Sequence, residues 1–541
     1  MVDFCYYHVV PVAVARVNTG GFAFTPNAYT SSTFWHPILQ LITSGDNRGS
    51  WSQRIAWRIR EVNGSLRQEK FKELDPIFYP RSVAVAGAST DEGKIGSQWY
   101  KSFLCDAFKG KAYAMNPKGG EVFGRKTYPD LKSIPGSVDL VVSCIPRDGV
   151  LDLLDDCAAK GIKAIQFFTA GFRETHESKW IEVEKEMVRI ARRGRFRIIG
   201  PNCFGIYCPE GGVPFGPVMA PGKIGPIGFI SQSGGHAGKM LEIGPGRGMS
   251  FSKVISMGNG ADLESAEYTE YLALDPKTKV IGLYLEGPED SRRLIETIGA
   301  ASESKPVVVW KGGRTEAGFR ATASHTGALA ASASVWSGAL KQAGAIEVNG
   351  LEELADTLLL FQTVGEIREC HAGIVCGLTD GGGGESVLTA DSCAYLGVPV
   401  PALTADTSKK LLGLLGQVGS IVDNPVDISQ RTGNLQVFRQ VTELVAADPR
   451  IDIIVVYENV DILSKFLSTE LVEETNRLII ELSLRQAKPV VVVMPPGSAE
   501  IRRLEIEGRL TEAGIPVYPT MDRAAKAISN VSRYISSQTG T

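Results

Sequence analysis

The most regular feature of the sequence is a series of short apolar runs with amphipathic stretches between them. From residue 78 onward, apolar runs typical of buried strands occur at residues 82–86, 112–115, 138–144, 163–168 and 196–199. Stretches with helical spacing, such as 148–160 and 179–192, separate them. Strands that alternate with helices are typical of parallel βαβ units with right-handed crossovers. The pattern therefore predicts an α/β protein.

The alternation begins again near residue 223 and once more near residue 372. In the second unit, apolar runs occur at residues 227–230, 251–257, 280–285 and 306–310. The third unit looks like a diverged repeat of the second. The sequence of residues 448–457 is similar to that of residues 275–284, and the sequence of residues 488–492 is similar to that of residues 305–309. The expected domains are 74–218, 219–366 and 367–541, and residues 1–73 are an irregular extension, a docking arm, or the product of a start codon placed too early.

Composition narrows the class of protein. The 541 residues predict about three domains, and a net charge of -3 gives no electrostatic basis for nucleic-acid binding. No apolar run reaches the ~20 residues needed to span a bilayer, and the first residues lack the basic region of a signal peptide. The nine cysteines are scattered without a C-x-x-C pair, which argues against disulfides and zinc. We expect a cytoplasmic protein without a metal site, a membrane segment or a nucleic-acid partner.

Parallel sheets bind ligands at the carboxyl ends of their strands. In the first unit the candidates there, with Lys94 shortly after the first turn, are Gly87, Ala88, Ser89, Asn116, Lys118, Ile145, Pro146, Ala170, Gly171, Asn202 and Cys203. The G-x-G-x-x-G fingerprint of NAD domains is missing, and the second strand ends in Asn116-Pro117-Lys118 rather than in an acid. Lys118 suits the 3′-phosphate of CoA or the 2′-phosphate of NADP, or it is a solvated surface charge.

Two features of the second unit are candidates for anion chemistry. Ser231-Gln232-Ser233-Gly234-Gly235 follows a strand and opens a helix, so its hydroxyls and backbone N–H groups predict an anion cradle; the alternative is ordinary N-capping. Glu286 ends another strand and could hold an imidazole in one tautomer; the alternative is a helix-capping or surface glutamate.

His325 is the candidate for phosphorylation. It follows a strand-like run and the Gly-rich residues 311–316, and a helix-like pattern begins near Gly327. We therefore expect His325 on a small-residue loop close to a helix start, where the imidazole is accessible and backbone N–H groups favour an anion. The alternative is a turn histidine with a satisfied hydrogen bond. In the third unit, Thr379-Asp380-Gly381-Gly382-Gly383-Gly384 either admits a phosphate or carboxylate close to the backbone or is a flexible turn.

Together these pieces resemble the NDP-forming acyl-CoA synthetases, the superfamily of succinyl-CoA synthetase and ADP-forming acetyl-CoA synthetase. The likeness covers roughly residues 74–535. Its motifs are Pro80-Arg81-Ser82-Val83-Ala84-Val85, Asn116-Pro117-Lys118, Thr169-Ala170-Gly171-Phe172, Gly200-Pro201-Asn202-Cys203, Ser231-Gln232-Ser233-Gly234, Ser324-His325-Thr326-Gly327 and Asn424-Pro425-Val426-Asp427. The resemblance implies a CoA-binding Rossmann-like domain followed by two flavodoxin-like ligase domains.

The resemblance also implies the roles of the candidate residues. His325 would be the phosphorylated histidine and Glu286 its stabilising carboxylate. The strand ends of the first domain would hold CoA, and the phosphate sites would use Ser231, Ser233, Gly234, Gly235, Gly327, Gly382 and Gly383. Acyl-CoA and phosphate would give acyl phosphate, which phosphorylates His325, and His325 would then phosphorylate ADP with the help of Mg²⁺.

Three departures from the family pattern stand out. No stretch is left for the family's ATP-grasp module, so ADP or ATP and Mg²⁺ are expected on an ATP-grasp β-type partner chain, in a hetero-oligomer. His236 stands where a small or apolar residue is more usual and is either a phosphate contact or a cap. Asp380 stands where Asn is more usual and would repel an acid substrate. The competing functions are a CoA-binding regulatory protein without turnover and an NADP oxidoreductase, for which no hydride-transfer constellation is present.

Overall fold

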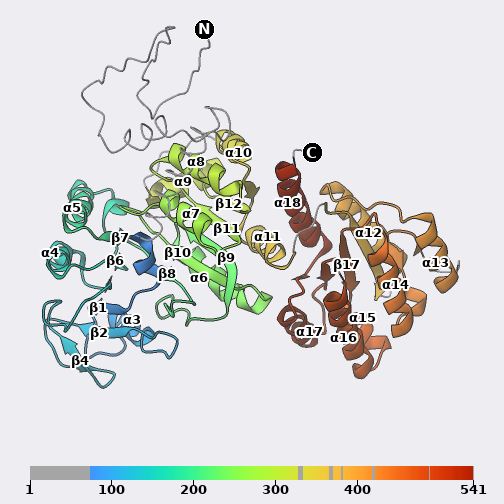
Figure 1. Ribbon diagram of the computed structural model, residues 1–541, viewed down its shortest axis with the longest axis horizontal. Helices are drawn as coiled ribbons and strands as arrows, with labels where there is room; N and C mark the ends of the chain where they lie inside the picture. Colours follow the sequence, from blue (N-terminus) through green and yellow to red (C-terminus); the bar gives the residue numbers. More distant parts are fainter. Residues whose placement is uncertain are drawn as a thin grey trace, which may run out of the picture. The chain divides into compact units, whose positions relative to one another are not determined.

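The computed structural model describes residues 73–326, 333–364, 369–378, 382–416, 421–486 and 488–539, and the side chains of residues 322–326, 378, 382 and 539 lie outside the described set. Residues 71–541 form one compact unit that contains three β-sheets in succession (Figure 1). The predicted extension 1–73 lies outside the described residues except for its last position. None of the described helices is long and apolar enough to cross a bilayer.

The first sheet has the strand order β3-β4-β2-β1-β5-β6-β7. Its strands are β1 Ser82–Ala86, β2 Lys111–Met115, β3 Glu121–Val122, β4 Arg125–Tyr128, β5 Leu140–Ser143, β6 Ala164–Phe167 and β7 Arg197–Ile199, with helices α3 Ile95–Ser102, α4 Val150–Lys160 and α5 Ser178–Gly194. All pairs except β3–β4 are parallel, as predicted. The β3–β4 hairpin was not predicted. Its turn residues Phe123 and Gly124 both have positive φ, a conformation that a phenylalanine does not signal.

The second sheet has the order β13-β12-β11-β9-β10-β8. Its strands are β8 Gly205–Tyr207, β9 Ile224–Ser231, β10 Phe251–Ser256, β11 Val280–Leu285, β12 Val307–Lys311 and β13 Ile346–Val348. Its helices are α6 Gly234–Ile243, α7 Ser265–Leu274, α8 Ser291–Ser302, α9 Glu316–Thr326, α10 Ala333–Gln342 and α11 Leu351–Thr363. Strand β8 pairs antiparallel with β10, so a strand that precedes residue 218 completes the edge of this sheet.

The third sheet has the order β15-β16-β14-β17-β18-β19. Its strands are β14 Ala372–Leu378, β15 Ile421–Val422, β16 Val426–Asp427, β17 Ile453–Glu458, β18 Val490–Val493 and β19 Val517–Tyr518. Its helices are α12 Gly382–Tyr395, α13 Ala405–Leu415, α14 Leu435–Ala447, α15 Val460–Phe466, α16 Thr469–Arg485, α17 Glu500–Glu512 and α18 Met521–Thr539.

A buried carboxylate joins the second and third units. Asp356 of α11 is almost fully buried and accepts from Arg247 at 2.5 Å and from Arg523 of α18 at 2.7 Å. Asn530 of α18 also donates to Thr357 at 2.9 Å. Removing one partner of a buried ion pair costs about 3–5 kcal/mol, so this contact fixes α18 against α11.

The repeat seen in the sequence has a structural counterpart. Lys305 Nζ donates to the carbonyl of Asp275 at 2.6 Å, and Lys488 Nζ donates to the carbonyl of Asp448 at the same distance. Burial lowers the pKa of Lys305 to about 8 and lowers that of Lys488 as well. Each lysine therefore closes the same Asp-Pro turn in its own sheet.

Candidate functional site

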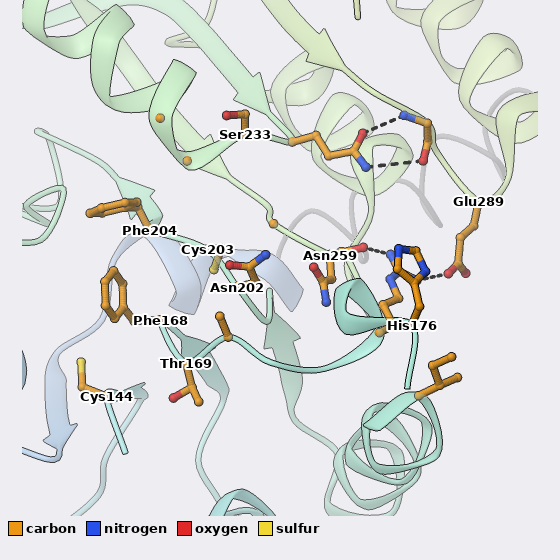
Figure 2. A pocket seen from close by; sticks show the side chains of 18 of the residues that line it. Cys144, Phe168, Thr169, His176, Asn202, Cys203, Phe204, Ser233, Asn259 and Glu289 are labelled. Carbon is orange, nitrogen blue, oxygen red and sulfur yellow. Dashed lines mark hydrogen bonds and ion pairs between the residues drawn. The ribbon is translucent and has the colours of Figure 1, made fainter. Parts of the chain in front are cut away.

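The main cavity lies where the carboxyl ends of strands from the first sheet face the amino end of α6. It has a volume of about 1040 Å³. The predicted site residues that line it are Ile145, Pro146, Ala170, Asn202, Cys203, Ser233, Gly234 and Gly235. Figure 2 shows Asn202 and Asn259 in the middle, Phe168 and Phe204 at one end, and His176 and Glu289 at the other. The cavity therefore brings together the predicted cofactor and phosphate residues of two different units.

The other cofactor candidates of the first unit lie outside the cavity lining: Gly87, Ala88, Ser89, Lys94, Asn116, Lys118 and Gly171. Gly87 has φ +101°, and a Cβ on Gly96 would come within 2.3 Å of the Gly87 carbonyl oxygen. These glycines thus let α3 pack closely on the first turn. Lys118 is exposed in the turn after β2, and its N–H donates to Asn116 Oδ1 at 3.0 Å.

The loop between β9 and α6 has the geometry of an anion site. Ser233 is the N-cap of α6, and its Oγ accepts from the N–H of His236 at 3.4 Å. Gly234 and Gly235 form the first turn and line the cavity. A helix start with small residues leaves N–H groups for a phosphate. Ser231 is fully buried and its hydroxyl donates to the Ser233 carbonyl at 2.6 Å, so only one of the two predicted hydroxyls faces the cavity.

Glu286 is held in place at the end of β11. Only 8% of the residue is exposed, and Oε1 accepts from the Tyr284 hydroxyl at 3.0 Å. Its backbone N–H donates to Gln232 Oε1 at 2.8 Å, and its carbonyl accepts from Lys311 Nζ at 2.6 Å. Its burial contradicts a surface role, and Asp290 caps α8, the following helix. Glu286 is thus a buried carboxylate tied, through Gln232, to the loop that begins α6.

His236 lies beside this carboxylate. Its ring centroid is 4.5 Å from that of Tyr284 and 4.7 Å from that of Trp310. Burial lowers the pKa of His236, although the nearby charge of Glu286 acts in the opposite direction. Its backbone N–H completes the cap of α6, while the imidazole packs among aromatic rings.

The structure corrects the predicted surroundings of His325. The prediction of a loop was wrong, because the backbone of His325 lies in the helix α9 Glu316–Thr326. The helix is stabilised by Thr315 Oγ1, which accepts from Gly318 N at 3.1 Å, and by an ion pair between Glu316 and Arg320 at 2.8 Å. The start of α9 lies at Glu316, well before His325 along the chain, and carries a negative charge, so α6 rather than α9 offers the helix start that an anion needs. The side chain of His325 and the whole of Gly327 lie outside the described residues.

The sequence analysis missed a polar cluster at the cavity. Arg173 forms ion pairs with Glu289 and with Glu184, and it donates to the Asn259 carbonyl. Asn259 Nδ2 donates to Glu174 at 2.7 Å and to Glu184 at 2.9 Å. Burial raises the pKa of Glu184.

A sequence signal for part of this cluster existed. Asn259 stands between Gly258 and Gly260, which both have positive φ, directly after the strand-like run of β10. A Cβ on Gly258 would lie 2.3 Å from the Pro201 carbonyl oxygen. Such a Gly-x-Gly turn marks a close approach of two backbones, here of the second unit to the first.

The glycine cluster of the third unit lies elsewhere. Residues 379–381, including Asp380, are outside the described set. Gly382 and Gly383 begin α12, and Gly383 is exposed with nothing within 4 Å of an added Cβ. Among the described residues, no member of the third unit lines the cavity.

Comparisons with known proteins agree with this architecture. A CoA binding domain model matches residues 81–209, and a model of a succinyl-CoA ligase like flavodoxin domain matches residues 224–361. The chain is 36% identical over 454 residues to the ADP-forming acetate–CoA ligase II subunit alpha of Pyrococcus furiosus, a match that covers 84% of this chain and 96% of that subunit.

Two further comparisons define the family. The ADP-forming acetate–CoA ligase I of Archaeoglobus fulgidus is 35% identical, over 85% of this chain and 64% of that protein. The dinucleotide-forming acetyl-coenzyme A synthetase 1 of Candidatus Korarchaeum cryptofilum, solved with phosphate and ADP, matches with a TM-score of 0.74 and 30% identity, over 86% of this chain and 97% of that one. The chain belongs to the NDP-forming acyl-CoA synthetases and is an acid–thiol ligase component of the ADP-forming type, which favours a ligase over a CoA-binding regulator.

Proposed function

We propose that the chain is the α-type component of a ligase that interconverts acyl-CoA, phosphate and ADP with a small carboxylic acid, CoA and ATP, through His325. The observation that carries the proposal is the cavity in which strand ends of a CoA-binding domain face the amino end of α6. A thioester from one side and a phosphate from the other meet there. Relatives named as acetate–CoA ligases support a small carboxylic acid as the substrate.

The reaction runs through an acyl phosphate. A phosphate oxygen attacks the thioester carbon, the C–S bond breaks, and CoA leaves as the thiol. An imidazole nitrogen of His325 then takes the phosphoryl group, and the carboxylate leaves. Phosphohistidine finally transfers the group to ADP, and the reverse sequence makes acyl-CoA from ATP. The backbone N–H groups of Gly234 and Gly235 and the Ser233 hydroxyl stabilise charge on the phosphate and on the transition state.

The remaining candidate residues divide between the two ends of CoA. The first-unit candidates that line the cavity would contact the thioester end; they are Ile145, Pro146, Ala170, Asn202 and Cys203. The nucleotide end of CoA would lie along the carboxyl edge of the first sheet, outside the cavity. The candidate residues at this edge are Gly87, Ala88, Ser89, Lys94, Asn116, Lys118 and Gly171. Glu286 would stabilise His325 as an imidazolium, as carboxylate–histidine pairs do. Gly327, Gly382 and Gly383 remain proposed phosphate contacts.

The nucleotide and Mg²⁺ would bind to an ATP-grasp partner in a hetero-oligomer. The match to the Archaeoglobus ligase covers only 64% of that protein, so the remainder of that protein has no counterpart in this match. Within the described ranges, the three sheets and their helices leave no separate lobes for an ATP-grasp module. Mg²⁺ would neutralise charge on the transferring phosphate. The scattered cysteines without a C-x-x-C pair suit a reducing compartment, and we propose the cytoplasm.

The dependence on a partner gives the direct test of this function. The purified chain is expected to form no acyl-CoA from ATP, acetate and CoA, and to form it when an ATP-grasp β-type subunit is added. Coenzyme A consumption and acetyl-CoA formation would be followed by chromatography, with His325→Asn in the same mixture as the control. ATP-dependent acetyl-CoA formation by the chain alone, free of partner by mass spectrometry, would contradict the division between two chains.

The placement of the nucleotide end of CoA predicts a role for Lys118. We expect CoA to bind more tightly than dephospho-CoA, because a lysine–phosphate pair is charge-assisted. Lys118→Ala should remove most of a difference of about tenfold, since hydrogen bonds to charged groups contribute about 1.5–3 kcal/mol and Lys118 is exposed. Calorimetry with both ligands measures this, and Lys239→Ala, on the exposed side of α6, is the matched control. Equal affinities for the two ligands would remove Lys118 from the site.

A further inference from the structure

Three aromatic rings pack together beside the loop that begins α6. The rings of His236, Tyr284 and Trp310, here called the ring cluster, come from α6, β11 and β12. Their centroids lie 4.5 Å apart for His236 and Tyr284, 4.7 Å for His236 and Trp310, and 4.4 Å for Tyr284 and Trp310. Each ring contacts the other two, and Tyr284 is almost fully buried, so packing against its neighbours restricts its rotamer. The ring cluster therefore fixes the direction of the Tyr284 hydroxyl.

That hydroxyl is the link between the ring cluster and Glu286. It donates to Glu286 Oε1 at 3.0 Å in a buried position. The backbone of Glu286 is held separately, by Gln232 at its N–H and by Lys311 at its carbonyl. The main-chain contacts fix where Glu286 is, and the hydrogen bond from Tyr284 fixes which way its carboxylate points.

The charges around the ring cluster indicate that it acts through packing. The titratable groups that face His236 are Tyr284 and Glu286 from the end of β11, and Lys311 from β12 approaches the Glu286 carbonyl. Burial lowers the pKa of His236 against the opposing effect of Glu286, so the imidazole is uncharged near neutral pH. Burial also lowers the pKa of Lys311. An uncharged imidazole in contact with two rings serves as an aromatic surface.

The repeat in the third unit offers an internal comparison. When residues 448–457 are aligned with residues 275–284, Tyr457 stands at the position of Tyr284. Two residues later the third unit has Asn459, whose side chain caps α15 by accepting from Ile462 N at 3.3 Å. In the third unit no histidine follows residues 488–492, the stretch that corresponds to 305–309 in the second unit. Pro495 and the residues that follow occur there instead. A tyrosine–carboxylate pair two residues apart thus occurs in the unit that carries His325, whereas in the third unit the Tyr457 side chain hydrogen-bonds to Glu385 of α12.

We propose that the ring cluster positions the Glu286 carboxylate for His325, and that the Tyr284 hydroxyl is the contact through which it acts. The inference rests on the proposed phosphohistidine function and adds to it the residues that orient the stabilising carboxylate. Tyr284 is a positioning residue, since it acts through Glu286. Its hydroxyl removes one rotational freedom from the carboxylate, so that the charge is held in one direction.

The test uses Tyr284→Phe in the full-length chain, which keeps the ring and removes only the hydroxyl. The rate at which [³²P]acetyl phosphate labels His325 is expected to fall roughly ten- to hundredfold, the effect of losing one hydrogen bond to a charged group. The half-saturating concentration of acetyl phosphate should stay unchanged, because the phosphate loop is untouched. Tyr113→Phe, which removes a hydroxyl that donates to the Pro135 carbonyl at 3.3 Å in the first unit, should label at the wild-type rate.

A double variant separates positioning from general damage. In a Glu286→Gln background, Tyr284→Phe should add little further loss, because residues that act through one another are not additive. A full additive loss in the double variant would overturn the inference.

The outcome for the wild-type chain distinguishes this inference from the function on which it rests. An unlabelled wild-type chain would overturn the proposed function and the inference with it. A labelled wild-type chain together with an unaffected Tyr284→Phe variant would overturn the inference alone.

Discussion

Replacing His325 with asparagine is expected to abolish phosphorylation of the chain by labelled acyl phosphate. Asparagine has no nitrogen that can accept a phosphoryl group as an imidazole does, so the covalent intermediate cannot form. In the wild-type chain the label should be lost in acid and retained in base, as a phosphoramidate is. Incubation with [³²P]acetyl phosphate, followed by gel electrophoresis after acid and base treatment, measures both results.

Two other histidines serve as controls for this result. His371 lies at the amino end of β14, where its Nδ1 is 3.1 Å from Glu369 Oε2 and 3.0 Å from Asp452 Oδ2, and His371→Asn should be labelled like the wild type. His236 lies beside the phosphate loop and is the next acceptor if the assignment of His325 is wrong. Label that survives in His325→Asn and disappears in His236→Asn would move the phosphorylation site to His236.

The Glu286→Gln variant should fold normally and phosphorylate His325 roughly a thousandfold more slowly. A carboxylate about 4 Å from an imidazolium contributes about 4 kcal/mol at an effective dielectric constant of about 20, and 4 kcal/mol corresponds to about 10³ in rate. Glutamine keeps the size of the side chain and an oxygen that can accept from Tyr284, so the hydrogen bond seen at 3.0 Å is retained while the charge is lost. Rapid-quench measurement of the labelling rate, with thermal unfolding in parallel, separates catalysis from stability.

A matched glutamate provides the control for the lost charge. Glu242 lies in α6, the helix that begins at the phosphate loop, but on its exposed side, where it pairs with Lys239. Glu242→Gln removes the same kind of charge from the helix that begins at the phosphate loop and should leave the labelling rate unchanged. If Glu286→Gln labels at the wild-type rate, Glu286 has a structural role in holding the end of β11.

Much of the first sheet could be predicted because β1, β5 and β6 are buried along their length. A strand such as β5 is covered on both faces, so its apolar run is continuous and visible in the sequence. The β3–β4 hairpin was missed because its strands are short and largely charged, and because its turn uses Phe123. His325 was placed in a loop because its small neighbours were taken as loop residues, whereas Ala317, Ala321 and Ala323 favour the helix that α9 forms.

Some residues of the site are placed by the local sequence around them, and others come together only through tertiary packing. The helix start at Ser233 and the position of Glu286 at a strand end follow from short stretches of sequence, and both were predicted. The cluster of Arg173, Asn259 and Glu289 was not predicted, because its members are separated by 86 and 116 residues along the chain and each is an ordinary surface type alone. Only the approach of the first two units makes them one cluster.

By itself, the sequence determined the alternation of the buried strands with helices, the repeat of the second unit in the third, and the residues that stand at strand ends. These features follow from periodicity and turn chemistry within a few residues. The tertiary structure alone decided which strand-end residues share a cavity, that Ser231 faces inward, and that the rings of His236, Tyr284 and Trp310 meet at Glu286. The physical reason is that these contacts depend on how separate elements pack, and packing joins side chains whose separation along the chain leaves no local pattern.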